Sequence, residues 1–142
     1  MIKTWRLEPN RLEWRHAGRP CLIVRNDVMG NLCGYVGVPT TRATDPTLVR
    51  RLEDIAHGGI TYGPEACEEG GRVCHVPLPG ETEVMWFGFD CAHSGDLVPF
   101  YVDPPACLPF SFASFTYWKG AKYRDISYVR DIVNRMAEAC EG

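Results

Sequence analysis

The sequence has no uninterrupted apolar run of about 18 residues, which is the length that a helix needs to cross a lipid bilayer. It also has no apolar stretch near its first residue, because Lys3, Arg6 and Glu8 place charges where a secretory leader carries apolar side chains. We therefore expect a cytoplasmic protein and no membrane partner.

The sequence also lacks an excess of basic residues. Fifteen Lys and Arg stand against 18 Asp and Glu, and the formal net charge is −3. A nucleic-acid polymer is bound largely through its phosphate charges, so we expect no such partner, although a single nucleotide in a pocket is compatible with this charge. The 142 residues are 45% hydrophobic and 23% charged, which is typical of one folded domain covering residues 1–142. The sequence does not decide whether the chain forms a homo-oligomer.

Seven cysteines are present, but their number is odd and their spacing is irregular. Without a secretory leader, this usage favours reduced thiols over a disulfide framework. Cys67 and Cys74 are further apart than the paired cysteines of a zinc knuckle. Cys74 and His75 could still join Cys91 and His93 as four zinc ligands from neighbouring strands, and we keep structural zinc as a minor alternative.

Alternating and continuous apolar patterns predict six strands, at 12–16, 21–25, 32–38, 60–62, 72–78 and 84–90. The last of these is apolar on both faces, which is typical of a central strand covered on both sides. The proline-rich residues 94–109 predict an irregular loop, and the aromatic residues 110–118 predict an extended segment packed on the core.

Two amphipathic helices complete the pattern. Asp45 and Pro46 are typical of a helix start, and apolar residues at spacings of three and four continue for about ten residues. A second apolar face runs from Arg124 to Cys140 and predicts a longer C-terminal helix. The fold class is therefore α+β: a mostly antiparallel sheet of about five to six strands, with one short helix and a long C-terminal helix.

The segment Asp90–Asp96 (DCAHSGD) holds most of the polar chemistry, directly after the predicted central strand. In a helical bend, Asp90, His93 and Asp96 would align and suit a divalent metal with oxygen and nitrogen ligands. The same residues also suit acid–base catalysis. A polar turn would explain them without any ligand.

The segment His57-Gly58-Gly59 follows the first predicted helix. Two glycines allow backbone N–H groups to converge on a phosphate or carboxylate, so this segment is a candidate anion site with His57 as a catalytic residue. Two glycines are also an ordinary helix stop. Arg124, near the start of the last helix, could add a guanidinium for the same anion, or could be a surface group.

Three further residues are candidates for ligand contact. Cys91 could act as a nucleophile with His93 or His57 as its base, but the nearby carboxylates work against a thiolate. Tyr62 and Trp86 could form a wall for a planar ligand, although aromatic side chains are more often part of a core.

The segments Gly34–Pro39 (GYVGVP), His57–Tyr62 (HGGITY), Trp86–Asp96 (WFGFDCAHSGD) and Tyr123–Asp125 (YRD) occur together in this chain. In this combination the chain resembles a group of small uncharacterised proteins found largely in bacteriophage genomes and prophages. The resemblance implies a phage or bacterial cytoplasmic setting. It also implies an accessory or counter-defence role, and it supplies no activity.

Three functions follow as hypotheses. The first is a small-ligand site with hydrolytic or other acid–base chemistry on a phosphorylated or nucleotide-like molecule, with a divalent metal as a cofactor option. The second is a non-catalytic protein that sequesters a nucleotide-like signal. The third is a structural or protein-interaction module in which both histidine segments only shape the fold.

Overall fold

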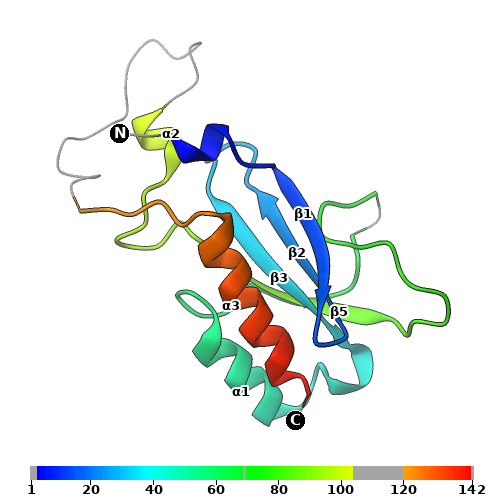
Figure 1. Cartoon of the computed structure of the whole chain (residues 1–142). Helices are drawn as coiled ribbons and strands as arrows, with labels where there is room; N and C mark the ends of the chain where they lie inside the picture. The colour runs from blue at the N-terminus through cyan, green and yellow to red at the C-terminus, as the bar shows by residue number, and fades with distance from the viewer. Residues whose placement is uncertain (1–2, 69, 104–119, 142) are drawn as a thin grey trace.

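One antiparallel sheet of five strands, in the order β1-β2-β3-β5-β4, forms the body of the computed structural model (Figure 1). The structure describes residues 3–68, 70–103 and 120–141. The strands are β1 (Arg11–His16), β2 (Arg19–Arg25), β3 (Leu32–Pro39), β4 (Tyr62–Glu65) and β5 (Val84–Asp90). The predicted α+β class is confirmed, and the predicted central strand at 84–90 has the observed bounds of β5.

Helices α1 (Pro46–Ile55) and α3 (Ile126–Ala139) cover one face of the sheet, as Figure 1 shows. Each begins at an aspartate: Asp45 accepts a hydrogen bond from the backbone N–H of Thr47, and Asp125 accepts one from that of Tyr128. Helix α3 lies close to β3 because Gly34 has no side chain; a Cβ there would lie 2.7 Å from Val133. The remaining helical turns are η1 (Thr4–Arg6), η2 (Thr40–Arg42) and α2 (Pro99–Val102).

The two faces of β5 belong to two different cores, since side chains alternate along a strand. Phe87 and Phe89 pack beneath the helices, with Leu52 and Val133 among their neighbours. Trp86 faces the opposite side and joins a second cluster, which the segment between β4 and β5 covers. The second cluster consists of Leu22, Val24, Tyr35, Val73, Val84 and Trp86.

Two predicted strands differ from the structure. The strand expected at 60–62 begins later, as β4. Residues 72–78 form no strand, because side chains of β1, and not the backbone of a neighbouring strand, make hydrogen bonds to the backbone of this segment. Arg11 donates to the backbone carbonyls of Arg72 and Cys74, and Glu13 accepts from the N–H of Val76.

The predicted loop at 94–109 is partly ordered. It contains α2, and Asp96 forms an isolated bridge with Lys122. Residues 104–109 of this loop and the predicted extended segment 110–118 lie outside the described residues. Within the described ranges, no helix is long and apolar enough to cross a membrane.

Candidate functional site

A buried carboxylate, Asp96, organises the candidate site. It is 2% exposed and lies in the turn after β5. Nε2 of His57 lies 2.8 Å and 3.0 Å from its two carboxylate oxygens, and Nε of Arg124 donates to Oδ1 at 2.8 Å. The backbone N–H of His93 donates to Oδ2 at 2.9 Å. Asp96 therefore joins the segment after α1, the turn after β5 and the start of α3.

The partners of Asp96 keep it ionised. Burial by itself would raise the pKa of this carboxyl group. Hydrogen bonds from Arg124, His57 and the backbone of His93 act in the opposite direction, and the net pKa is below the ordinary value for aspartate. The same contact raises the pKa of Arg124, so the pair is charged at neutral pH.

His57 extends this contact to a hydroxyl group on α3. Its Nδ1 lies 2.8 Å from Oη of Tyr128, and its Nε2 faces Asp96. In the tautomer with its proton on Nε2, toward the carboxylate, Nδ1 accepts from the tyrosine hydroxyl. The guanidinium of Arg124 lies over the ring of Tyr128, 4.8 Å from its centroid. The resulting chain, Asp96–His57–Tyr128, has the order of carboxylate, imidazole and hydroxyl.

The glycines after α1 do not form an open anion site. The N–H of Gly59 donates to the carbonyl of Ala56, and the N–H of Ile60 donates to the carboxylate of Glu53. Gly58 and Gly59 have φ values of +72° and +90°, which end the helix. The N–H groups of Gly59 and Ile60, at the segment predicted to bind an anion, therefore already donate to oxygen atoms of the chain itself.

Gly58 serves a second purpose, which is the close approach of His93. A Cβ on Gly58 would lie 2.5 Å from Cδ2 and Nε2 of His93. The rings of His57 and His93 are 5.6 Å apart between centroids, edge to face. The two histidine segments of the sequence therefore meet in space.

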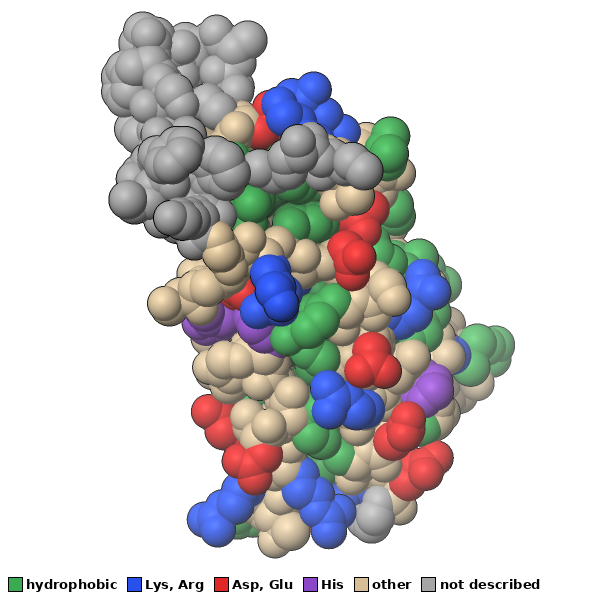
Figure 2. Space-filling model, turned by 60° about the vertical axis from the view of Figure 1, so that its left-hand side comes forward, with side chains coloured by type: hydrophobic (Ala, Val, Ile, Leu, Met, Phe, Trp, Pro, Cys, Tyr) green, Lys and Arg blue, Asp and Glu red, His purple; other side chains and the backbone are tan. Residues whose placement is uncertain are grey.

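His93 is the more accessible of the two imidazoles, with 31% of its side chain exposed. Its Nε2 is buried and lies 3.3 Å from Oδ1 of Asp90, without the alignment of a hydrogen bond. Its Nδ1 makes no hydrogen bond to any described residue. Asp90 also accepts from the N–H of Ala92, which shapes the turn. Figure 2 shows histidines at the surface beside a basic side chain, on a face where charges of both signs are interspersed.

The structure does not gather Asp90, His93 and Asp96 as metal ligands. Among the described residues, the only set of three or more His, Cys, Asp or Glu ligand atoms within 4.8 Å of one another is that of Cys67, Cys74 and His75. The carboxylate of Asp96 is directed at His57 and Arg124 instead.

Cys91 is placed beneath the site and not in it. Its side chain is 2% exposed and belongs to the helix-covered core. Burial, with further contributions from Asp96 and Cys33, raises the pKa of this thiol. A buried, protonated thiol is a poor nucleophile, so the structure does not favour this role for Cys91.

Tyr62 and Trp86 lie on the other face of the sheet, away from the histidines. Trp86 is fully buried in the second cluster, and Tyr62 packs against that cluster with its ring edge-on to Tyr35. The predicted aromatic wall is therefore not part of this site. The reason is the alternation of β5, which sends Trp86 to the face opposite Phe87 and Phe89.

The expectation of reduced thiols is wrong at one pair, because Cys67 and Cys74 form a disulfide. The free thiols among the described residues are Cys21, Cys33, Cys91 and Cys140. The four-ligand zinc set is also not assembled, since Cys91 and His93 are not in the group that contains Cys74 and His75.

One functional candidate was missed in the sequence. Tyr128 is four residues after Arg124, a spacing that places both on one face of a helix and could have indicated that they act together. Cys67 was considered only as a zinc ligand and was set aside on its spacing from Cys74; the two form a disulfide across a sequence separation of 7. Comparisons with protein-family models, curated proteins and solved structures give no match.

Proposed function

We propose that the Asp96–His57–Tyr128 chain, with His93 and Arg124 beside it, performs acid–base chemistry on a small anionic ligand. The observation that carries this proposal is the hydroxyl of Tyr128, which lies 2.8 Å from an imidazole whose other nitrogen is bonded to a buried carboxylate. This is the arrangement by which a histidine, oriented by an acid, exchanges a proton with a hydroxyl group.

Each residue has a distinct role in the proposal. Asp96 holds the tautomer and orientation of His57, and His57 takes a proton from or returns it to Tyr128. His93, whose ring nitrogens make no hydrogen bond to any described residue, is the second acid–base group and contacts the ligand directly through its exposed side. Asp90, at the end of β5, places its negative charge 3.3 Å from Nε2 of His93.

The proposed ligand is phosphorylated or nucleotide-like, because Arg124 supplies the main cation at the site. Its hydrogen bond to Asp96 uses Nε, so the two terminal nitrogens of the guanidinium can form a fork for phosphate oxygens. Hydrolysis is the leading reaction, since proton transfer to a leaving group and from a nucleophile requires two acid–base groups. A divalent metal remains a cofactor option that the ligand's phosphate could recruit.

A non-catalytic binder is the second candidate. The same guanidinium fork and imidazoles would hold a phosphorylated signal without turning it over. Together with the resemblance to phage proteins, this would suit counter-defence by sequestration in a bacterial cytoplasm. A purely structural or protein-interaction role is the third outcome.

The test uses the untagged chain and a panel of linear and cyclic nucleoside phosphates, with products separated by chromatography and affinity measured by calorimetry. Turnover of one member supports the enzyme, and tight binding without turnover supports the binder. Arg124→Lys keeps a cation beside Asp96 but removes the fork, so it should weaken binding. Arg135→Lys, on the exposed face of α3, is the matched control and should not.

His93→Ala separates the ligand site from the structural role. The proposal expects loss of turnover or binding in a variant that still folds cooperatively. A variant that melts several degrees lower yet binds the same panel member with unchanged affinity would contradict the site.

A further inference from the structure

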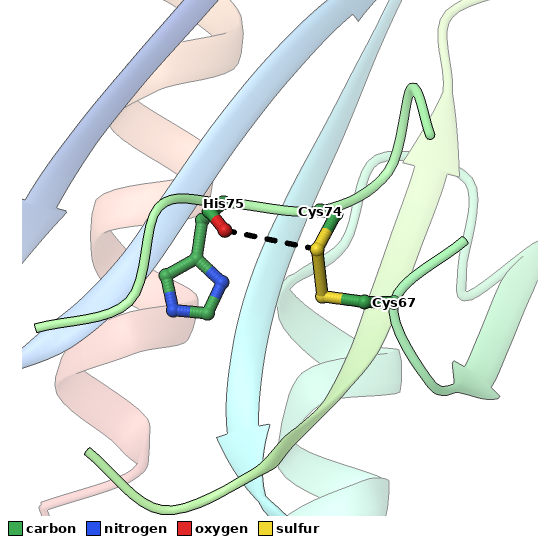
Figure 3. A group of neighbouring side chains, drawn as sticks. All are labelled: Cys67, Cys74 and His75. Carbon is green, nitrogen blue, oxygen red and sulfur yellow. Dashed lines mark hydrogen bonds between the residues drawn. A yellow bond between two sulfur atoms is a disulfide. The ribbon is translucent and has the colours of Figure 1, made fainter. Parts of the chain in front are cut away.

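A cavity of about 400 Å³ lies away from the histidine pair, beside the Cys67–Cys74 disulfide. Its lining includes Cys67, Cys74, His75, Glu81, Val84 and Met85. The ligand atoms of Cys67, Cys74 and His75 lie within 4.8 Å of one another (Figure 3). Two sulfur atoms and one imidazole nitrogen are ligands that zinc prefers.

The imidazole of His75 has a buried nitrogen atom that no hydrogen bond to a described residue satisfies. The side chain is 6% exposed, and its Nδ1 is buried without a hydrogen-bond partner. Figure 3 shows one ring nitrogen turned toward the two sulfur atoms. This nitrogen is Nδ1, because Nε2 contacts the carboxylate of Glu81. An orphaned polar atom this deeply buried is costly unless a partner is supplied.

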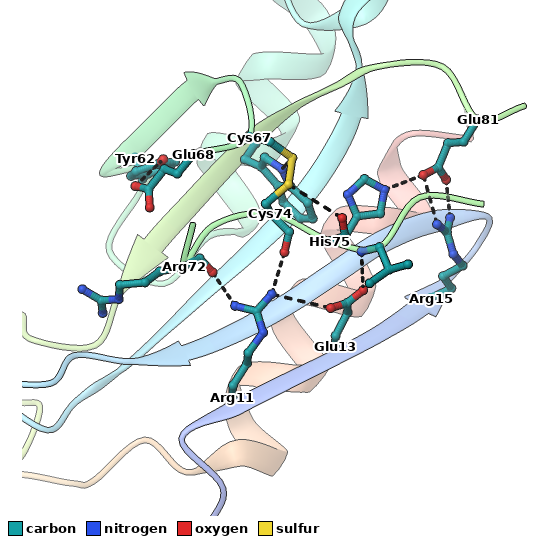
Figure 4. The surroundings of a disulfide bond; sticks show 12 residues. Arg11, Glu13, Arg15, Tyr62, Cys67, Glu68, Arg72, Cys74, His75 and Glu81 are labelled. Atoms are coloured by element: carbon teal, nitrogen blue, oxygen red, sulfur yellow. Dashed lines mark hydrogen bonds and ion pairs between the residues drawn. A yellow bond between two sulfur atoms is a disulfide. The ribbon is translucent and has the colours of Figure 1, made fainter. Parts of the chain in front are cut away.

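Glu81 fixes the proton and the orientation of the ring. Its carboxylate accepts from Nε2 of His75 and from both terminal nitrogens of Arg15 (Figure 4). A proton on Nε2 leaves the lone pair on Nδ1 for coordination. In many zinc sites a carboxylate accepts a hydrogen bond from one nitrogen of a histidine whose other nitrogen binds the metal.

A third group supports the sulfur atoms. The indole Nε1–H of Trp86 donates to Sγ of Cys67 at 3.3 Å, and the ring of Trp86 meets His75 edge to face at 5.4 Å. A hydrogen bond to sulfur stabilises a thiolate, which is the form that binds a metal. The backbone of Cys74 is held by Arg11, so the loop that carries two of the three ligands is fixed on β1.

We propose that Cys67, Cys74 and His75 form a redox-controlled site for a thiophilic divalent cation such as Zn²⁺. A dithiol reductant transfers two electrons and two protons to the disulfide, which breaks the S–S bond and leaves the reductant as its own disulfide. The cation then binds both sulfurs as thiolates with Nδ1 of His75, and two protons are released. Water or an external ligand that enters from the adjoining cavity would complete the four ligands. A low-molecular-weight disulfide reverses the step: it takes the two electrons and two protons and becomes two thiols, while the Cys67–Cys74 bond reforms and the cation is released.

Cobalt is the test metal, because four-coordinate Co²⁺ bound to thiolates absorbs visible light. The whole untagged chain is reduced with a phosphine, which takes up oxygen from water as the disulfide gains its protons, and is desalted anaerobically. The reduced chain should bind one equivalent of Co²⁺, which Zn²⁺ displaces. The oxidised chain should bind none. A reduced chain without this absorption, or an oxidised chain that binds equally, would overturn the proposal.

Variants and a protection experiment assign the ligands. His75→Gln should abolish the cobalt absorption, whereas His16→Gln, which removes a half-buried histidine paired with Glu138, should not. Glu81→Gln should weaken binding by about 10- to 100-fold. In the reduced wild-type chain, Zn²⁺ should protect Cys67 and Cys74 from alkylation while Cys33 reacts at the same rate with and without Zn²⁺. Equal alkylation of Cys67 and Cys74 with and without Zn²⁺ would contradict the assignment even if the variants did not fold.

Discussion

The imidazole of His93 rests directly on the backbone of Gly58, with no room for a side chain between them. This contact joins the segment that ends α1 to the turn that follows β5. It also sets the distance between His93 and His57, whose ring centroids are 5.6 Å apart. A substitution at Gly58 should therefore act on the site as well as on stability.

Gly58→Ala should destabilise the fold through two costs. The φ of +72° costs an alanine roughly 1–2 kcal/mol, and the overlap with His93 costs about 1–3 kcal/mol more. Gly18→Ala is the matched control, because Gly18 has a φ of +75° and open space around its Cβ position. Urea unfolding of both variants measures the difference, which isolates the contact with His93.

The double variant Gly58→Ala, His93→Ala tests that assignment. Removing the ring should recover the overlap cost, so the two substitutions should couple by about 1–3 kcal/mol. Strict additivity of the two single effects would show that His93 does not rest on Gly58 in solution.

Asp96→Asn should cost about 3 kcal/mol of unfolding free energy. The substitution removes the charge that compensates Arg124, whose side chain is only 24% exposed, and this cost is at the lower end for a buried pair because Arg124 keeps some hydration. Asp131→Asn breaks an exposed pair with Arg135 and should cost less than about 1 kcal/mol. Chemical denaturation of both variants gives the comparison, and equal losses would mean that Asp96 is not the organising group.

Glu81 should make the chain sensitive to acid. Hydrogen bonds from Arg15 are the largest cause that lowers the pKa of Glu81 to about 2, from an ordinary value of 4.5. A group whose folded pKa is depressed contributes full stability above its unfolded pKa and loses it as the pH falls through the folded pKa. The stability difference between wild type and Glu81→Gln should therefore be constant above about pH 4.5 and shrink toward about pH 2. A difference that does not change over this interval would contradict the pairing.

Local sequence patterns were sufficient for much of the fold. The continuous apolar run of β5 and the helix start at Asp45 depend on neighbours in the sequence, and both are confirmed. The strand expected at 72–78 is wrong because Arg11 and Glu13, far away in the sequence, provide the hydrogen-bond partners of that segment. Tertiary contacts of this kind leave no local pattern.

The candidate site was predictable in part for the same reason. The His57 and Asp90–Asp96 segments were recognised by composition, and the structure brings His57, His93 and Asp96 together. Trp86 was misplaced, although the alternation of β5 already assigns it to the other face. Tyr128 was missed, because its contact with His57 depends on the packing of α3 against the end of α1.

Tyr128→Phe tests the central claim most directly, because it removes only the hydroxyl group that ends the Asp96–His57–Tyr128 chain. The measurement is the rate of turnover of whichever nucleoside phosphate the wild-type chain hydrolyses, together with the melting temperature of both proteins. The account predicts a rate lower by about 10²- to 10⁴-fold, with a melting temperature close to that of the wild type. An unchanged rate in the folded variant would contradict the proposed acid–base role of the chain.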